Sequence, residues 1–453
     1  MDCPKESQNR LAFCGNFVHA TKEEPLVIQQ NFCLGVVDGK IVFFEKMDTL
    51  EARLEEFLIP KENVTNLKEG QFILPGFVDT HIHASQYPNA GKGLDLQLLE
   101  WLEKYTFPAE ARYKDQTFAN NAYETAVNRV IQNGTTTACY FATIHTDATL
   151  LLCNIIHKTG QRALVGKVNM NMNSPDFYRE ETEESVTETE RYIKSVLDKK
   201  YPLITPVITP RFSGSCDSKL LKQLGDLAKK YKVPIQSHVS ENKKEVEFVR
   251  KLFPESKNYT DTYYTAGLLT NRTVLAHGVF LSSEELSLIK AMGTSLSHCP
   301  NSNISIKSGL LDVREVLDLG IKVGLGTDVS GGYSSSMLDA MRSAIHVSKT
   351  LGIQNGDDYR VIDHKEAFMM ATLGGSEALG LEDKVGNFVV GKEFDAVLID
   401  AKVVGSPLDV FKEDTFEDVV EKFMYLGDDR NIVAVFVAGR LVCDKRRPES
   451  AVE

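Results

Sequence analysis

The feature that most constrains the fold is a regular alternation of short apolar segments with amphipathic helical segments through the middle of the chain. Eight segments have the length and composition of buried strands: 72–80, 136–142, 163–169, 203–209, 234–238, 273–277, 294–298 and 322–328. Helical patterns occupy 183–199, 217–231, 283–291 and 334–350. Eight strands with helices between most of them predict a (β/α)8 TIM-like barrel. An open doubly wound sheet is the alternative, but it would be favoured by a glycine-rich phosphate loop after an early strand, which the sequence lacks.

Both ends of the chain have β character. Apolar runs at 11–20 and 32–46 are interrupted by Asp38-Gly39, a strong hairpin-turn signal. The runs 394–400 and 433–444 have the same character, with Gly439 at the reversal. We therefore expect a small β-sandwich domain built from residues 1–70 and 386–453, flanking a barrel formed by residues 71–385.

Composition restricts the partners. The 453 residues carry 51 basic and 63 acidic side chains, a net charge of −12, which argues against binding to a nucleic acid backbone. No apolar stretch approaches the ~18 residues of a membrane span, and the first ten residues lack the apolar core of a secretory signal. The eight cysteines form no C-x-x-C pair and lie within apolar runs, which favours buried, reduced thiols. These observations predict a cytoplasmic protein that acts on a small molecule, without a nucleic acid or membrane partner.

Ligand-type side chains lie at the carboxyl ends of several predicted strands. The first strand ends in His81-Ile82-His83, the fifth in His238, the sixth in His277 and the eighth in Asp328. In a barrel all these ends meet on one rim, where active sites are built. Residues two apart on a strand share a face, so both imidazoles of the H-x-H pair can reach one ion. The set predicts a catalytic site for zinc or a related divalent ion, with an open coordination position.

Other polar residues near the predicted rim have competing interpretations. Glu241 follows His238 by three residues, where the next helix should start. It could stabilise the first turn of that helix as an acidic residue, but its place beside a ligand favours a role in proton transfer. Arg211 and Phe212 follow the fourth strand and could serve a pocket or the packing equally. His145 and His298 are expected to be hydrogen-bonded structural residues.

Several segments carry a more specific resemblance. They are PGFVDTHIHASQY (75–87), KYTFPAE (104–110), PRFSGSC (210–216), QSHVSEN (236–242), SHCPNSNISIKSG (297–309) and GLGTDVSGGYSSSMLDA (324–340). With further segments they extend over essentially the whole chain, which resembles the guanine deaminase family of the amidohydrolase superfamily. The D-x-H-x-H and late G-T-D patterns are superfamily signals, whereas HASQY, KYTFPAE and PRFS are specific to this family.

The resemblance implies a zinc-dependent hydrolysis of guanine to xanthine and ammonia in purine catabolism, by a homodimer, with zinc-bound hydroxide attacking C2 of the purine. One zinc ion per chain would be held by His81, His83, His238 and Asp328, because the fourth strand lacks the lysine that binuclear relatives typically carry. The implied catalytic residues are Glu241 as the proton shuttle, His277 beside the water, and Asp328. The implied substrate contacts are His83, Ala84, Ser85, Gln86, Arg211, Phe212, His238, Val239, Ser240, Glu241 and Asp328.

Two rival functions stay open at this point. Another deaminase or a dechlorinase of the same barrel class would share the metal residues, and only Gln86, Arg211 and Phe212 would distinguish it. A catalytically silent barrel that binds a partner would typically lack some of the histidines, and none of the expected ligands is missing. The last residues, Ser450-Ala451-Val452-Glu453, do not fit the apolar pocket of a PDZ domain, so we expect no such scaffold binding.

Overall fold

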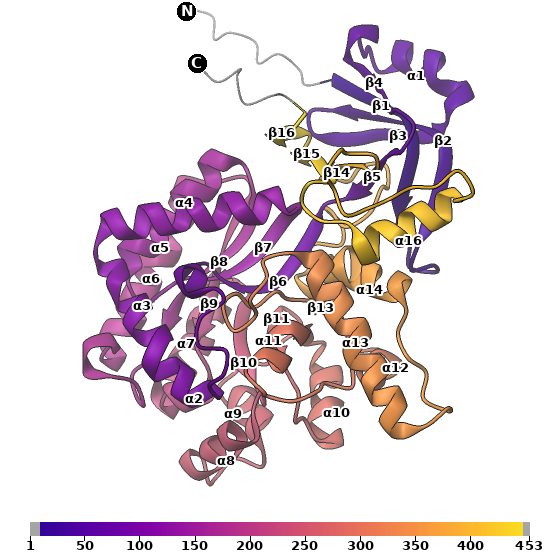
Figure 1. The fold of residues 1–453 in the computed structure, drawn as a ribbon. Helices are drawn as coiled ribbons and strands as arrows, with labels where there is room; N and C mark the ends of the chain where they lie inside the picture. The colour runs from indigo at the N-terminus through magenta and orange to yellow at the C-terminus, as the bar shows by residue number, and fades with distance from the viewer. Residues whose placement is uncertain (1–9, 447–453) are drawn as a thin grey trace, which may run out of the picture.

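The computed structural model describes residues 10–446; Cys3 and the last four residues lie outside this range. Its larger part is a nearly closed barrel of eight parallel strands surrounded by helices (Figure 1). The strands are neighbours in chain order, from β6 to β13. Their bounds are β6 (Phe77–His83), β7 (Thr135–Phe141), β8 (Arg162–Asn169), β9 (Ile204–Pro210), β10 (Ile235–Val239), β11 (Thr273–His277), β12 (Ser295–His298) and β13 (Val323–Leu325). The predicted barrel is confirmed.

Seven predicted strand segments each contain or overlap one barrel strand, and the first one is wrong in its extent. The segment 72–80 is divided between β5 (Gln71–Pro75), which belongs to a different sheet, and β6. Gly76 lies between them, and a Cβ at this position would lie 2.1 Å from Oγ1 of Thr136. A side chain larger than that of glycine would therefore collide with β7 at the point where the chain passes from one sheet to the other.

The helices around the barrel follow the amphipathic segments of the sequence. The four predicted helices correspond to α6 (Thr182–Lys199), α7 (Ser218–Tyr231), α10 (Ser283–Met292) and α13 (Met337–Asn355). The others of the barrel part are α2 (Leu98–Trp101), α3 (Phe107–Ala111), α4 (Gln116–Gln132), α5 (Thr146–Thr159), α8 (Lys243–Leu252), α9 (Tyr259–Thr265), α11 (Pro300–Ser305), α12 (Val313–Asp318), α14 (His364–Ala371) and α15 (Leu373–Ala378). Local capping starts many of them; Ser282, for example, accepts a hydrogen bond from the backbone of Glu285 in a capping box.

A mixed sheet from both ends of the chain forms the smaller part. Its order is β16-β15-β14-β5-β1-β2-β3, with β4 paired to β1. The bounds are β1 (Arg10–His19), β2 (Val27–Val37), β3 (Lys40–Lys46), β4 (Val64–Asn66), β14 (Ala396–Asp400), β15 (Ile432–Val437) and β16 (Arg440–Asp444), with α1 (Leu50–Glu56) and α16 (Phe416–Leu426) beside them. In Figure 1 the indigo and yellow strands accordingly lie together. The predicted domain boundaries, between residues 70 and 71 and between residues 385 and 386, stay a prediction.

The barrel closes between its first and last strands through backbone hydrogen bonds. The N–H of Asp328 donates to the carbonyl of His81 at 2.9 Å, and the N–H of His83 donates to the carbonyl of Val329 at 3.0 Å. The buried carboxylate of Asp79 accepts hydrogen bonds from the hydroxyl and backbone N–H of Thr327 at 2.5 and 3.1 Å. These contacts join β6 to the segment that follows β13, on the rim that carries the predicted ligands.

A buried ion pair connects the two parts of the molecule. Arg162 begins β8, and its guanidinium donates to both carboxylate oxygens of Asp395 at 2.8 and 3.1 Å and to Glu393 at 2.8 Å. Asp395 also accepts from the backbone N–H of Ala438, just after β15. One carboxylate thus holds the barrel, the start of β14 and the turn before β16 together.

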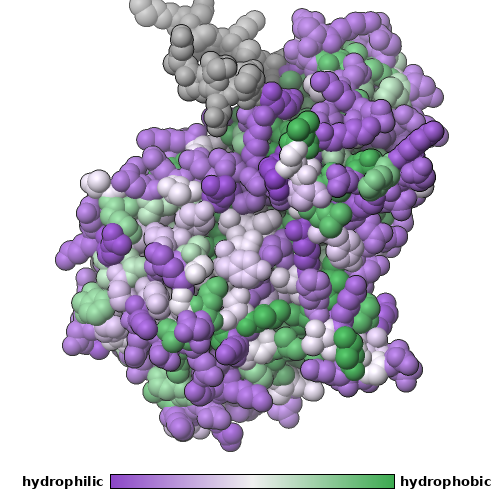
Figure 2. All heavy atoms as spheres, in the orientation of Figure 1, coloured by the Kyte–Doolittle hydropathy of each residue, from purple (hydrophilic) through white to green (hydrophobic). Residues whose placement is uncertain are grey.

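The face of the molecule shown in Figure 2 is largely polar. Hydrophilic side chains dominate the face in Figure 2, with scattered apolar residues between them. Among the described helices, none has the length and apolar character needed to cross a membrane. The seven cysteines in the described range are all free thiols, and all except Cys443 are buried, in agreement with the sequence prediction.

We expect Asp395→Ala to lower the free energy of unfolding by about 3–5 kcal/mol, because it leaves the buried guanidinium of Arg162 without its main counter-charge. Denaturant unfolding monitored by circular dichroism measures the change. Lys61→Ala is the control, since Lys61 forms an exposed ion pair with Glu51 at 2.6 Å and should change stability by less than about 1 kcal/mol. A loss for Asp395→Ala no larger than that of the control would contradict this account of the junction.

Candidate active site

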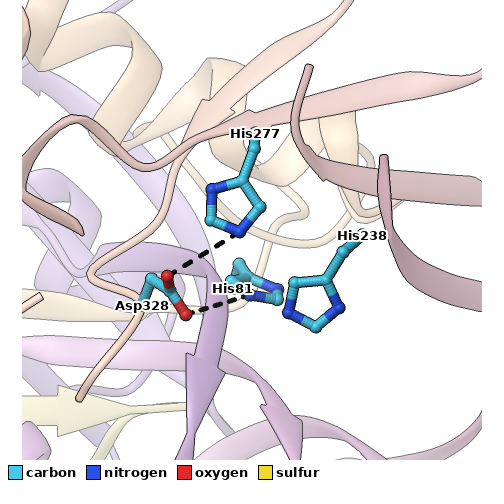
Figure 3. A group of neighbouring side chains, drawn as sticks. All are labelled: His81, His238, His277 and Asp328. Carbon is cyan, nitrogen blue, oxygen red and sulfur yellow. Dashed lines mark ion pairs between the residues drawn. The ribbon is translucent and has the colours of Figure 1, made fainter. Parts of the chain in front are cut away.

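Three imidazoles and one carboxylate converge at the carboxyl rim of the barrel. Ligand atoms of His81, His238, His277 and Asp328 all lie within 4.8 Å of one another (Figure 3). Nε2 of His81 lies 3.2 Å from Oδ1 of Asp328, and Nε2 of His277 lies 3.7 Å from Oδ2. The four side chains come from β6, β10, β11 and the loop after β13. Strands far apart in the sequence therefore supply one compact donor set.

His83 lies at the edge of the same cluster. Its Nε2 is 3.1 Å from Nε2 of His238 and 3.4 Å from Oδ1 of Asp328. His81 and His83 both line the cluster because they stand two residues apart on β6. The cluster and His83 together include all four predicted metal ligands and also His277. Which of these five side chains bind a metal ion stays a prediction.

Hydrogen bonds on the outer ring nitrogens orient two of the imidazoles. Nδ1 of His238 is 2.6 Å from the carbonyl oxygen of Arg211, which can only accept a hydrogen. Nδ1 of His277 is 2.8 Å from Oδ1 of Asn303. When these nitrogens carry the proton, the Nε2 lone pairs face the centre of the cluster.

The charge states suit a divalent cation. Burial lowers the pKa values of His81, His83 and His238, so these imidazoles are neutral and can act as ligands. Burial would raise the pKa of Asp328, but the neighbouring His81 and His277 overcome this effect and hold it well below its usual range. The Nε2 atoms of His81 and His277 have no hydrogen-bond partner within residues 10–446. Buried nitrogens left without a partner, beside an ionised carboxylate, fit a bound metal ion.

The backbone takes an unusual conformation at three positions of the site. Ser240, His277 and Asp328 have φ values of +46°, +74° and +46°. Such left-handed conformations are uncommon for residues other than glycine and occur often at functional sites. They lie at the ends of β10, β11 and β13, where the chain turns from the strand into the rim loops.

Glu241 lies beside the cluster on the loop between β10 and α8. Its Oε2 is 3.5 Å from Nε2 of His277, and its Oε1 accepts a hydrogen bond from Ser308 at 3.0 Å. Burial raises the pKa of Glu241 to about 7, although His277 opposes the shift. The backbone N–H of Glu241 donates to the buried carboxylate of Glu245 at 2.8 Å, which fixes the loop. A carboxyl group with such a pKa can both accept and return a proton near neutral pH.

A pocket opens on the cluster, with an empty volume of about 440 Å³ that includes space open to solvent. Predicted residues in its lining are His83, Gln86, Arg211, Phe212, His238, Glu241, His277 and Asp328. Ala84, Ser85, Val239 and Ser240 belong to the same segments but are not in the lining, and the hydroxyl of Ser85 donates to the carbonyl of Ala142. Contacts of these four residues with a substrate stay predictions.

Several lining residues were missed from the sequence. Leu98 and Trp101 of α2, and Leu102 directly after it, cover the pocket together with Ile306. Glu110 on α3 lies behind the pocket, where it binds both Arg211 and Gln86. The segment KYTFPAE (104–110) matches the family specifically, and this match is the sequence signal that points to Glu110.

The two histidines predicted to be structural differ in outcome. His145 is half-buried at the start of α5; its ring is hydrogen-bonded to the backbone of Ala111, as expected, although Nε2 has no partner among the described residues. His298 ends β12, fully buried, and neither of its ring nitrogens has a hydrogen-bond partner within the described range, so the predicted hydrogen bonding is wrong. Burial lowers the pKa of His298 to about 3, which keeps the ring neutral. A neutral ring can pack at the end of β12 without a partner more easily than a charged one.

Comparisons with known proteins agree with this geometry. The sequence model of the amidohydrolase family matches residues 72–442. Guanine deaminases from Pongo abelii and Homo sapiens are each 53% identical over 437 residues, which is 95% of this chain and 96% of each relative. A crystal structure of guanine deaminase from C. acetobutylicum, with guanine bound in its active site, is 37% identical and superposes with a TM-score of 0.89. The match covers 95% of this chain and 99% of that one.

We expect the purified protein to bind about one divalent metal ion per chain, and His81→Ala to weaken this binding by at least about 10–100-fold through loss of a ligand. Metal analysis after dialysis and calorimetric titration with Zn²⁺ measure both. His157→Ala is the control, because His157 is an exposed residue of α5. Equal metal content in the His81→Ala and His157→Ala variants would contradict the assignment of the cluster.

Proposed function

Since the chain belongs to the amidohydrolase family and, within it, to the guanine deaminases, we propose that it catalyses the hydrolytic deamination of guanine to xanthine and ammonia. The observation that carries the proposal is the pairing, in one pocket, of a metal-type cluster with the polar side chains of Arg211 and Gln86. The rival of a catalytically silent barrel has no support, because every ligand-type residue is present at the rim, and all except the half-buried His238 are buried.

The metal is best assigned as one zinc ion per chain, held by His81, His83, His238 and Asp328, with His277 beside its water. Neutral imidazoles with one carboxylate form a donor set that suits zinc. When bound, such an ion lowers the pKa of a coordinated water to about 7 and so makes a nucleophile available at neutral pH.

The residues of this chain then account for the proton movements. Glu241 accepts a proton from the water that adds to C2 of guanine and delivers it to ring N3, so that negative charge does not accumulate on the purine. Its raised pKa, about 7, suits both steps. His277 and Asp328, whose Nε2 and Oδ2 lie 3.7 Å apart, would hold this water by hydrogen bonds. The proton of the new hydroxyl group at C2 then passes, by way of Asp328 or His277, to the amino group. The C2–N bond breaks, ammonia leaves, and xanthine remains with the first proton on N3.

Arg211 recognises the purine, with Gln86 beside it in the pocket lining. The guanidinium of Arg211 is buried, lines the pocket and lies over the ring of Phe107 at 5.3 Å. Its N–H groups can donate hydrogen bonds to an acceptor such as the O6 carbonyl of guanine. A purine with an amino group at C6 would leave this buried donor without a partner, which disfavours its binding. Phe212 forms part of the apolar wall.

A homodimer in the cytoplasm that acts in purine catabolism completes the proposal. The dimer and the pathway rest on the family alone, whereas the cytoplasmic location also rests on the composition of the chain. Sedimentation of the purified protein tests the dimer.

We expect Glu241→Gln to lower kcat for guanine by about 10²–10⁴-fold while the metal content stays unchanged, because the amide cannot carry the proton. Ammonia release from guanine is the measurement. Glu247→Gln, an exposed position on α8, is the control and should keep full activity. Near-normal turnover of the Glu241→Gln variant would remove Glu241 from the mechanism.

Arg211→Ala is expected to reduce the preference for 6-oxo over 6-amino purines by at least about tenfold, because the donor that recognises the carbonyl is lost. The measurement compares inhibition of guanine deamination by hypoxanthine and by adenine. Arg179→Ala, at an exposed ion pair with Asp176, provides the control. If the Arg211→Ala variant keeps the preference of the unchanged protein, Arg211 does not read C6.

A further inference from the structure

Glu110 is a buried carboxylate that the mechanism does not use. It lies on α3, is fully inaccessible to solvent and is not part of the pocket lining. Its Oε2 accepts hydrogen bonds from Arg211 at 2.7 Å and from the hydroxyl of Tyr178 at 2.7 Å. Its Oε1 accepts from Gln86 at 3.0 Å and from the second guanidinium nitrogen of Arg211 at 3.1 Å. Both polar side chains at the purine end of the pocket are therefore bound to the same carboxylate.

This arrangement determines which atoms Gln86 and Arg211 present to a ligand. The carboxamide nitrogen of Gln86 faces Glu110, and its oxygen lies 3.3 Å from the backbone N–H of Ser330, so the amide has one orientation. The two bonds from Arg211 to Glu110 form a bidentate fork, which holds the guanidinium plane. Burial opposes the charge of Arg211, but Glu110 more than offsets this effect, and the pKa of Arg211 is raised.

We propose that Glu110 is a positioning residue that orients Arg211 and Gln86 for the purine and cancels the charge of Arg211, so that the pocket favours a neutral base over an anionic one. The inference rests on the proposed deamination of guanine and assigns a role to a residue that does not touch the substrate.

The charge balance matters because substrate and product differ in acidity. Guanine is neutral near pH 7. Replacing its 2-amino group by a carbonyl makes the ring N–H groups of xanthine more acidic, so the xanthine anion becomes populated as the pH rises. In a buried pocket a cation without a counter-charge attracts an anion strongly. With Glu110 ionised beside Arg211, that end of the pocket has no net charge, and the anionic product gains no extra binding energy that would slow its release.

Two substitutions separate orientation from charge. Glu110→Gln keeps the size of the side chain but removes the charge, whereas Glu110→Asp keeps the charge but shortens the reach to Gln86 and Arg211. Glu180→Gln is the matched control: Glu180 is a buried carboxylate paired with the buried Lys167 at 2.6 Å, and it is not in the pocket lining.

The readouts are KM and kcat for guanine, and the inhibition constant of xanthine from pH 6 to pH 9. Trp101 is the only tryptophan of the chain and lines the pocket, so its fluorescence also reports the binding of xanthine without turnover. Circular dichroism verifies that each variant is folded.

For Glu110→Gln we expect KM for guanine to rise about tenfold or more, and xanthine to bind more tightly as the pH rises, by about tenfold relative to the unchanged protein. For Glu110→Asp we expect a similar rise in KM but no tightening of xanthine binding. Glu180→Gln should lower stability and leave KM, kcat and the pH dependence of xanthine binding unchanged.

The proposal is overturned if xanthine binding to Glu110→Gln has the same pH dependence as in the unchanged protein, or if Glu110→Asp has an unchanged KM. If Glu110→Gln does not fold, the KM of Glu110→Asp alone decides whether Glu110 orients the pocket. Failure of the unchanged, metal-loaded protein to release ammonia from guanine would instead overturn the proposed function, which makes the two failures distinguishable.

Discussion

The closure of the barrel between its first and last strands is the constraint on which the active site depends. Asp79 and Thr327, 248 positions apart in the chain, are hydrogen-bonded within the closure. Beside them, the backbone of Asp328 donates to His81 and the backbone of His83 donates to Val329. The same few bonds that close the barrel thus set the spacing between the two imidazoles of β6 and the carboxylate after β13. A displacement of this closure would separate the ligands as well as open the sheet.

The pocket combines two ends with different electrostatics. At one end, the neutral imidazoles of His81, His83 and His238 lie beside the ionised Asp328, and Glu241 has a raised pKa because burial disfavours its charge. At the other end, Arg211 and Glu110 are both charged, but they are paired in a bidentate contact. The first end carries a negative charge that a bound cation neutralises, whereas the second end offers hydrogen-bond donors but has no net charge. In the proposed function, this difference orients guanine with its reacting carbon towards the cluster.

Sequence reasoning succeeded where periodicity and chain order carry the information. Alternating apolar and amphipathic segments located the barrel strands, and residues at the strand ends formed the cluster because parallel strands bring their carboxyl ends to one rim. It failed at 72–80, where a continuous apolar run conceals a change of sheet at Gly76. It also missed Glu110 and Trp101, which lie on short helical segments without a clear period and reach the pocket only through tertiary packing.

The sequence by itself determined the class of fold, the chemistry of the metal-type residues and the acid beside them, since these follow from residue type, spacing and position at strand ends. Only the tertiary structure decided which outer nitrogens of His238 and His277 are bonded, that His277 lies within the same donor set as His81, and that one buried carboxylate holds both Arg211 and Gln86. The physical reason is that hydrogen-bond partners and burial depend on contacts between segments distant in sequence. Those contacts exist only after the barrel has closed.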